Sequence, residues 1–325
     1  MTQQAPPTAS PNGQDGPNGQ GSHDSQGSHD GRAARRHVEM EIASQPESWR
    51  TAADLADELR ALLPAGRIAL TGCGTSFYVA QTVAVLWEAG GLGQADAFCA
   101  SEMPVRTDYD CVVVISRSGT TTEVIDLLHR LPDVRTLALV GSHGPISNAA
   151  THTLELAFAD EESVVQTRFA TSVVVLFRAL LGDDIGALAD RAALELSKTT
   201  LGFGDVDRFV FLGTGAGVGL AHEAALKMRE AARTVTESYP AMEYRHGPIA
   251  LAEPGVVVWL FGTPPAGLVD DVLRTGAIVI SDRLDPLIDL VRVQSAAVEI
   301  ANAKGLNADQ PRHLTRAVLL ADTSR

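Results

Sequence analysis

Residues 209–233 have the sequence FVFLGTGAGVGLAHEAALKMREAAR, which is the most informative stretch for the class of fold. Its apolar start, residues 209–212, predicts a buried strand. The glycines at alternate positions from 213 to 219 predict a turn, and residues 221–233 predict a long helix. A strand that leads through a glycine turn into a helix is typical of an α/β protein.

The predicted helix carries charged residues on one side. Positions three and four apart share a helix face, so Glu223, Lys227 and Glu230 should gather together. A carboxylate at the edge of a buried face is partly desolvated, and desolvation tunes a carboxylate toward use as a base near neutral pH. The same spacing is also that of a surface salt-bridge ladder, so spacing alone leaves both interpretations open. The apolar stripe that should face the core is Leu220, Ala224, Met228 and Ala231.

The strand-turn-helix pattern occurs twice in the chain. Residues 67–71 predict a strand, residues 72–76 (GCGTS) a turn, and the following residues a helix that runs to Trp87. The two glycine turns lie about 140 residues apart, which indicates a duplicated α/β domain. The uninterrupted Val, Ile and Leu runs at 111–116 and 136–140 are typical of parallel strands covered on both faces. The chain therefore predicts an α/β fold of two tandem three-layer αβα domains, each with a parallel sheet flanked by helices.

Other segments complete the expected organisation. We expect helices over 48–63, 123–131, 163–181 and 294–304, strands over 255–261 and 277–280, a link near 182–203, and a polar terminal strand or tail at 311–316. The domain boundaries that follow are a disordered low-complexity tail over 1–36, a first domain over 37–190, and a second domain over 191–325.

Composition excludes several classes of protein. The 325 residues are 45% apolar and 20% charged, which is ordinary for a globular protein. A net charge of −14 argues against a nucleic-acid partner, which would require clustered Lys and Arg. Neither an apolar run long enough to span a membrane nor a signal segment is present, so we expect no membrane partner.

The three cysteines, Cys73, Cys99 and Cys111, lack paired metal-ligand spacing, and a reduced cytoplasmic location is expected.

Two loops of the first half are suited to binding phosphate. In a parallel sheet the ligand crevice lies at the carboxyl ends of the strands, where helix N-termini present free N–H groups. Hydroxyls and backbone donors at a helix start can hold phosphate without a lysine, although the same residues are also good helix caps. Two such loops at neighbouring strand ends favour a phosphate site. Its candidate residues are Thr75, Ser76, Ser116, Ser118, Gly119, Thr121 and Thr122.

Neither glycine turn is a dinucleotide-binding fingerprint. The third glycine of the G-x-G-x-x-G pattern is replaced by Phe77 in the first half and by Val218 in the second. A nicotinamide-dependent enzyme is therefore unsupported. The matching loop of the second half, 261–265, lacks the Ser-x-Ser-Gly sequence, so one half is expected to hold phosphate and the other to supply the chemistry.

Four short segments together resemble the sugar isomerase (SIS) family. They are 73–76 (CGTS), 116–119 (SRSG), 223–230 (EAALKMRE) and 246–248 (HGP). Within that family they are similar to the double-SIS isomerase domain of glucosamine-6-phosphate synthase and to the related amino-sugar-phosphate deaminases and isomerases. The resemblance covers about residues 38–320.

The resemblance implies roles for individual residues. The family's phosphate-binding hydroxyls fall on Ser76, Ser116, Ser118 and Thr121. Its base, which moves a proton between carbons 1 and 2 of the sugar, falls on Glu230, and the lysine one helical turn earlier falls on Lys227. The histidine that opens the sugar ring falls on His246. In the synthases this histidine comes from the neighbouring subunit, which implies a homodimer, and such sites use no metal and no organic cofactor.

The chain departs from the synthase pattern in three places. No glutaminase sequence precedes the isomerase-like residues, so we expect no glutamine-driven amide transfer within this chain. The synthases' terminal lysine appears as Arg316, which does not readily form a Schiff base, but which can stabilise an enolate oxygen beside Lys227. Arg117 and Gln166 replace a glutamine and a serine, in the style of the deaminase-like branch, and with Glu223 they are further candidate substrate contacts.

The resemblance supports a phosphosugar-processing enzyme and leaves its net reaction open. A hexosamine 6-phosphate, free or N-acetylated, would undergo ring opening and loss of the carbon-2 proton, leading to isomerisation or deamination. Expulsion of the carbon-3 hydroxyl from N-acetylglucosamine 6-phosphate, a dehydratase reaction, is one alternative. A non-catalytic sugar-phosphate sensor, which would need neither base nor ring opener, is another.

Overall fold

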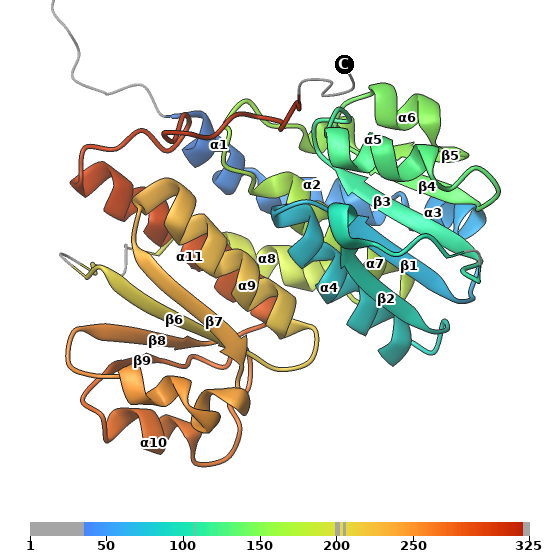
Figure 1. Ribbon diagram of the computed structural model, residues 1–325. Coiled ribbons are helices and arrows are strands. Elements are labelled where there is room, and N and C mark those ends of the chain that lie inside the picture. Colours follow the sequence, from blue (N-terminus) through green and yellow to red (C-terminus); the bar gives the residue numbers. More distant parts are fainter. Residues whose placement is uncertain (1–35, 107, 199–201, 204–205, 321–325) are drawn as a thin grey trace, which may run out of the picture. The chain divides into compact units, whose positions relative to one another are not determined.

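The computed structural model describes residues 36–106, 108–198, 202–203 and 206–320. The predicted tail, except for Arg36, lies outside these residues. The described chain contains two sheets in which every pairing is parallel (Figure 1). The first has the order β2 (Ala95–Cys99), β1 (Ile68–Gly72), β3 (Cys111–Ser116), β4 (Thr136–Val140) and β5 (His152–Glu155). The second has the order β7 (Val235–Pro240), β6 (Arg208–Gly213), β8 (Val256–Leu260) and β9 (Ile278–Ile280). The α/β prediction with two helix-flanked parallel sheets is confirmed.

Helices connect and cover the strands. Their bounds are α1 His37–Ala43, α2 Gln45–Ala53, α3 Ala56–Leu62, α4 Thr75–Ala89, α5 Thr122–His129, α6 Pro145–Ala149, α7 Arg168–Leu180, α8 Ile185–Leu196, α9 Gly217–Lys227, α10 Leu268–Leu273 and α11 Pro286–Ala303. None of these helices is long and apolar enough to cross a membrane, within the residues that the structure describes.

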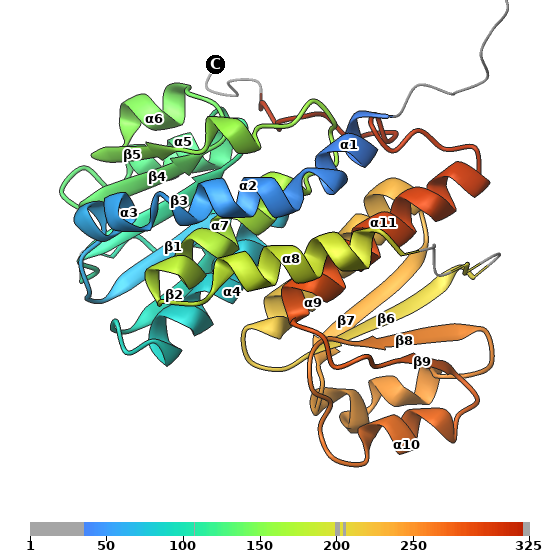
Figure 2. The same ribbon diagram turned by 180° about the vertical axis from the view of Figure 1, so that it is seen from behind.

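The central strands are buried along all or nearly all of their length because helices cover both faces of each sheet. Every residue of β1, β3, β4 and β8 is buried, as their continuous apolar runs predict. Figures 1 and 2 show α4, α9 and α11 between the two sheets, and side chains from these helices and from both sheets form one apolar core. Smaller cores lie beneath α5 and α6 on the first sheet and beneath α10 on the second.

Several predicted boundaries differ from the structure. The helix expected over 48–63 is two helices, α2 and α3, separated at Asp54 and Leu55. The helix expected from 163 begins only at Arg168, because the preceding residues form a loop that buried carboxylates hold. Most of the expected link over 182–203 is helix α8, and α11 begins eight residues before the predicted start at 294. The domain boundary at 190 stays a prediction.

The α11 start carries a local signal. Asp285 accepts a hydrogen bond from the Leu287 N–H at 2.9 Å, and Pro286 follows it as the first helical residue. A side-chain cap followed by proline is a common way for a helix to begin.

A close crossing of α4 and α9 at Gly219 aligns the two halves of the chain. A Cβ added at Gly219 would lie 2.4 Å from the Thr82 hydroxyl and 2.6 Å from the Tyr78 carbonyl oxygen. Replacing Gly219 with alanine should therefore destabilise the protein by about 1–3 kcal/mol, although alanine is normally the better helix residue. Urea unfolding measures this change.

Gly217 provides the matched control for that prediction. It lies in the same helix, and an added Cβ would meet Pro286 atoms at 3.5 Å and Phe261 Cβ at 3.9 Å, which are ordinary contacts. We expect Gly217→Ala to leave stability unchanged or to raise it slightly. Equal unfolding free energies for the two variants would show that the crossing is not tight.

Candidate active site

Lys227 is the centre of a buried polar cluster at the end of α9. Its Nζ lies 2.5 Å from Glu230 Oε2, 3.3 Å from Glu223 Oε1 and 3.0 Å from the Thr75 hydroxyl, to which it donates. Thr75 in turn donates to Glu223 Oε1 at 3.1 Å. Thr75 begins α4 in the first half, whereas the other three residues belong to the second half. The cluster therefore joins the two halves.

Burial decides between the two interpretations of the charged helix face. The side chains of Glu223 and Lys227 are 0% and 1% exposed, so the surface salt-bridge ladder is excluded. The apolar stripe beside them is fully buried, as predicted, at Leu220, Ala224, Met228 and Ala231. The carboxylates and the ammonium are thus partly or wholly removed from water.

Desolvation and pairing shift the ionisation of this cluster. Burial raises the pKa of Glu223 to about 7, although Lys227 pulls it the other way. Burial alone would lower the pKa of Lys227, but the neighbouring Glu223 and Glu230 outweigh it and the pKa is raised. Lys227 is consequently a protonated ammonium held between two carboxyl groups. Glu223 Oε2 has no hydrogen-bond partner among the described residues.

A cavity of about 170 Å³ adjoins this cluster. Lys227 and Glu230 line one side of it, and Thr75 with the neighbouring Cys73 and Gly74 lines another. The remaining wall comes from Thr121 in the loop after β3, from Val164 and Gln166 in the loop before α7, and from the C-terminal residues 314–318. The cavity therefore lies where the predicted phosphate loops meet the predicted base.

The phosphate loops follow two neighbouring strands. Strand β1 pairs with β3, so their carboxyl ends are adjacent, and the Ser116 and Thr121 hydroxyls lie 3.3 Å apart. Ser118 Oγ accepts hydrogen bonds from the backbone N–H and the hydroxyl of Thr120. Ser76 is buried in the first turn of α4.

Gly119 permits the close turn of the second loop. Its φ is +67°, a left-handed conformation that favours glycine, and an added Cβ would lie 2.3 Å from the Ser142 carbonyl oxygen. The loop from Ser116 to Thr122 can therefore lie directly against the loop after β4.

Arg117 is buried and faces the protein. Its Nη1 donates to the Ser163 carbonyl at 2.7 Å and lies 3.8 Å from Glu161 Oε2, and its Nη2 donates to the Arg316 carbonyl at 3.1 Å. Burial lowers the pKa of Arg117 and raises that of Glu161. Arg117 thus connects the phosphate loop, the loop before α7 and the C-terminal segment, and it does not line the cavity.

Arg316 lines the cavity, but its guanidinium group is engaged elsewhere. It forms an ion pair with Asp160 and donates to the Glu161 carbonyl at 2.7 Å. Its positive charge is therefore already compensated. Gln166 also lines the cavity, and its buried Oε1 has no hydrogen-bond partner among the described residues.

His246 is not brought into this cavity. It ends the short helix η4 (Glu243–His246) after β7, and it is exposed. Its predicted role as ring opener, contributed by a second subunit, stays a prediction.

The sequence did not indicate two parts of the site. The C-terminal segment packs over the first turn of α5, because the Thr122 N–H donates to the Val318 carbonyl at 3.3 Å and the Leu320 N–H donates to the Thr122 hydroxyl at 3.1 Å. Glu41 of α1 is buried and accepts from the backbone N–H groups of Glu162 and Ser163. No local pattern marks either contact, since the partners lie more than a hundred residues apart.

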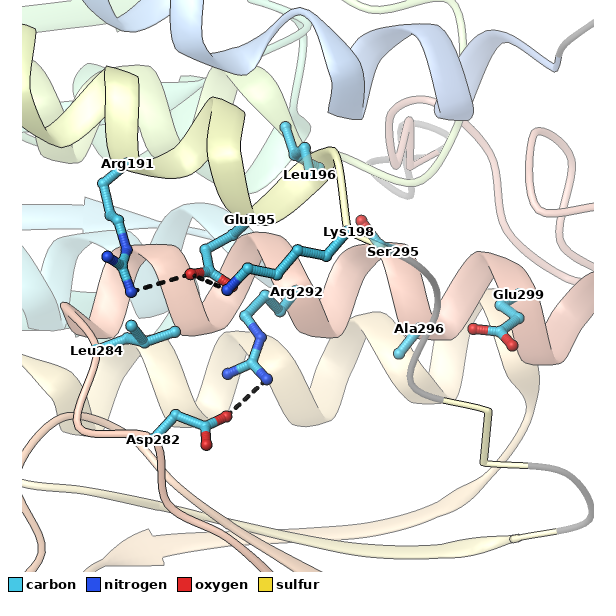
Figure 3. Close-up of a pocket in the computed structure, with 10 residues that line it drawn as sticks. All are labelled: Arg191, Glu195, Leu196, Lys198, Asp282, Leu284, Arg292, Ser295, Ala296 and Glu299. Atoms are coloured by element: carbon cyan, nitrogen blue, oxygen red, sulfur yellow. Dashed lines mark hydrogen bonds and ion pairs between the residues drawn. The ribbon is translucent and has the colours of Figure 1, made fainter.

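A larger cavity, of about 420 Å³, lies elsewhere and is a weaker candidate. It is formed by α8, α11 and the residues just before α11 (Figure 3). Its Arg191 and Lys198 both pair with Glu195, and its Arg292 pairs with Asp282, so each cation already has a carboxylate partner. None of the predicted site residues lines it.

Comparisons with known proteins agree with the fold. Residues 61–181 match the model of the SIS domain family. The chain is 29% identical to a glutamine–fructose-6-phosphate aminotransferase (isomerizing) of Bacteroides thetaiotaomicron, over 79% of this chain and 52% of that protein. It is 27% identical to the enzyme of the same name from Tropheryma whipplei, with the same coverage. The chain spans about half the length of these curated relatives.

Solved structures extend the similarity to nearly the whole described chain. A glucosamine-6-phosphate deaminase of Thermotoga maritima superimposes with a TM-score of 0.76 and 22% identity, over 88% of this chain and 100% of that one. The C-terminal domain of a glucosamine-fructose-6-phosphate aminotransferase from Francisella tularensis gives a TM-score of 0.69 and 20% identity with the same coverage. At these identities the likeness establishes the fold. Within this fold, residues 61–181 form a domain that matches the SIS domain family.

Proposed function

We propose that this chain is a phosphosugar-processing enzyme that acts on a hexosamine 6-phosphate as an aldose–ketose isomerase or deaminase. The observation that carries the proposal is the pairing of Glu230 with the buried Lys227 at the wall of a cavity that the phosphate loops also line. A carboxylate, an ammonium and an anion-binding loop around one cavity suit proton transfer next to a carbonyl in a phosphorylated sugar. One relative is named for fructose 6-phosphate and one structural neighbour for glucosamine 6-phosphate, and these names favour the same substrate class.

The phosphate group would bind at the starts of α4 and α5. Free N–H groups at a helix N-terminus attract an anion, and the hydroxyls of Ser76, Ser116, Ser118 and Thr121 add neutral donors. Such a nest holds the 6-phosphate without a lysine, so Lys227 stays free for the other end of the sugar. Glucosamine without phosphate should therefore be a poor substrate.

Proton transfer would then follow ring opening. His246 of a second subunit passes a proton between the ring oxygen and the anomeric hydroxyl, which gives the open-chain aldehyde. Glu230 removes the carbon-2 proton, and the electrons of the broken C–H bond move onto the carbonyl oxygen. Lys227, already protonated, stabilises that oxygen, the kind of electrostatic assistance that usually contributes most to such reactions.

The fate of the resulting enol depends on the nitrogen. Return of the proton to carbon 1, with loss of a proton from the carbon-2 nitrogen, forms a carbon–nitrogen double bond at carbon 2. With a free amine at carbon 2, the product is the ketose imine, and its hydrolysis by water releases ammonia and fructose 6-phosphate. With an N-acetyl group, ammonia does not leave readily, and loss of the carbon-3 hydroxyl as water becomes the competing outcome.

Separate incubations with glucosamine 6-phosphate and N-acetylglucosamine 6-phosphate in deuterated water test the proposal. We expect proton NMR to show loss of the carbon-2 proton signal, and an enzymatic assay to show ammonia and fructose 6-phosphate from the free amine. A product lighter by one water from the N-acetyl sugar would instead favour the dehydratase. Binding of both sugars without any exchange would contradict catalysis and favour a sensor.

A further inference from the structure

Helix α9 does not end as a regular α-helix. Residues Met228–Ala232 form a π-helical turn, η3, in which the Met228 carbonyl accepts from the N–H of Arg233, five residues later. The same carbonyl also accepts from the backbone N–H of Thr234 at 3.4 Å and from the Thr234 hydroxyl at 3.3 Å. Single π-turns within helices are rare and are often found at functional sites.

The π-turn changes the direction in which Glu230 points. Residues seven apart in an α-helix lie within about 20° of each other, so Glu230 would fall on the line of Glu223. That line is fully buried, since Glu223 is 0% exposed. A π-turn encloses one more residue, so each residue turns through a smaller angle and Glu230 rotates off this line. In the structure Glu230 is 19% exposed and lines the cavity.

Two side chains hold the turn at its end. The Thr234 side chain is buried, and its hydroxyl has the Met228 carbonyl as its hydrogen-bond acceptor. Lys304, just after α11, donates to the Ala232 carbonyl at 3.1 Å. Between them Arg233 has a φ of +54°, a left-handed conformation that is uncommon for a residue other than glycine. Such a conformation persists only where surrounding contacts hold it.

We propose that Thr234 is a positioning residue for Glu230: its hydroxyl holds the π-turn that directs this carboxylate out of the buried helix face and into the cavity. Lys304 supports the same turn from α11. This inference rests on the proposed role of Glu230 as the base, and Thr234 itself touches no substrate.

Three threonine variants test the inference. Thr234→Val removes the hydroxyl and keeps the size of the side chain, whereas Thr234→Ser keeps the hydroxyl. Thr236→Val is the matched control, because the Thr236 hydroxyl donates at 3.0 Å to the Ala225 carbonyl, in the α-helical part that precedes the π-turn. Its contact with the π-turn itself is a hydrogen bond at 2.9 Å from the exposed side chain of Arg229, and not to the backbone of the turn. If Thr234 only contributed to stability, Thr234→Val and Thr236→Val should change kcat and labelling to a similar extent.

The first readout is carbon-2 proton exchange with glucosamine 6-phosphate. We expect Thr234→Val to lower kcat by about ten- to a hundredfold, the size of effect that a small misplacement of a catalytic group produces. KM should stay within about twofold, because the phosphate loops are unchanged. The fall in kcat then reflects only the misplaced carboxylate of Glu230. Thr234→Ser and Thr236→Val should retain kcat. Wild-type kcat in a folded Thr234→Val protein would overturn the inference.

The second readout does not require activity. Carbodiimide coupling to glycine ethyl ester, followed by peptide mass spectrometry, measures how accessible each carboxyl group is. We expect labelling of Glu230, relative to the exposed Glu243, to fall at least severalfold in Thr234→Val and to be retained in Thr236→Val. Unchanged labelling would overturn the inference. If the wild-type protein exchanges neither sugar, the proposed function fails and the labelling alone decides the role of Thr234.

A folding control keeps the test decisive. Circular dichroism and thermal unfolding establish that each variant is native before its kcat and labelling are compared. Should Thr234→Val fail to fold, Lys304→Met, which removes the donor to the Ala232 carbonyl, is measured in the same way. Lower Glu230 labelling in that variant supports the inference, and unchanged labelling contradicts it.

Discussion

Replacing Glu230 with glutamine should lower carbon-2 proton exchange in glucosamine 6-phosphate by about 10²–10⁴-fold, the usual contribution of a positioned general base. The amide keeps the size of the side chain but cannot accept the proton. Glu230 is not among the residues proposed to bind the phosphate group, so KM should change little. Proton NMR in deuterated water, with saturating sugar phosphate, measures the exchange rate directly.

Glu243→Gln is the control for this prediction. Glu243 begins η4 and is exposed, so its replacement should leave the exchange rate unchanged. Exchange at the wild-type rate in Glu230→Gln would remove Glu230 from the role of base. Loss of exchange in both variants would indicate that the negative charge of the surface, rather than this carboxylate, controls the rate.

Replacing Lys227 with methionine should be among the most destabilising changes in the protein. It removes the cation that lies between Glu223 and Glu230 and leaves Glu223 buried without a counter-charge. Removing one partner of a buried ion pair typically costs about 3–5 kcal/mol. We expect a loss of this size at pH 8, measured by urea unfolding.

The loss of stability in Lys227→Met should be smaller at pH 5 than at pH 8. In the folded protein the pKa of Glu223 is raised to about 7 from 4.5, chiefly by burial. A carboxyl group whose pKa is raised on folding stabilises the folded protein while it is protonated. This stabilisation is fully present below pH 4.5 and is lost as the pH rises through about 7. Lys227 lowers the pKa of Glu223, so removing it raises this pKa further and widens the pH range over which stability is lost. The variant is therefore destabilised most where Glu223 must ionise.

A double variant separates charge from packing. Glu223→Gln combined with Lys227→Met leaves no uncompensated charge at position 223, so most of the pH 8 stability should return. If the single and double variants are equally unstable at both pH values, lost packing rather than buried charge accounts for the effect.

Much of the fold could be predicted from the sequence because its signals are local. The runs at 111–116 and 136–140 are strands with those bounds, since side chains buried on both faces leave an uninterrupted apolar pattern. The helical spacing of Glu223, Lys227 and Glu230 likewise predicted that they gather on one face. Polar strands are harder to predict. Strand β7 is half-exposed at a sheet edge, and its sequence, VTESYP, is typical of a loop.

The rest of the site depends on contacts between distant residues. Two such contacts join segments more than a hundred residues apart. They are the ion pair of Arg316 with Asp160 and the hydrogen bond that Glu41 accepts from the loop before α7. The π-turn is local, but its sequence, MREAA, is that of an ordinary helix. Its cause lies in Thr234 and Lys304, which act only once β7 and α11 have packed.

A crystal structure of Glu230→Gln soaked with glucosamine 6-phosphate would show whether residue 230 and the phosphate loops bind the same sugar. The variant should bind the sugar without converting it. We expect the phosphate group to lie among the hydroxyls of Ser76, Ser116, Ser118 and Thr121, with carbon 2 of the sugar facing residue 230. A phosphate bound elsewhere, or a carbon 2 turned away from residue 230 with no other carboxyl group nearby, would contradict it.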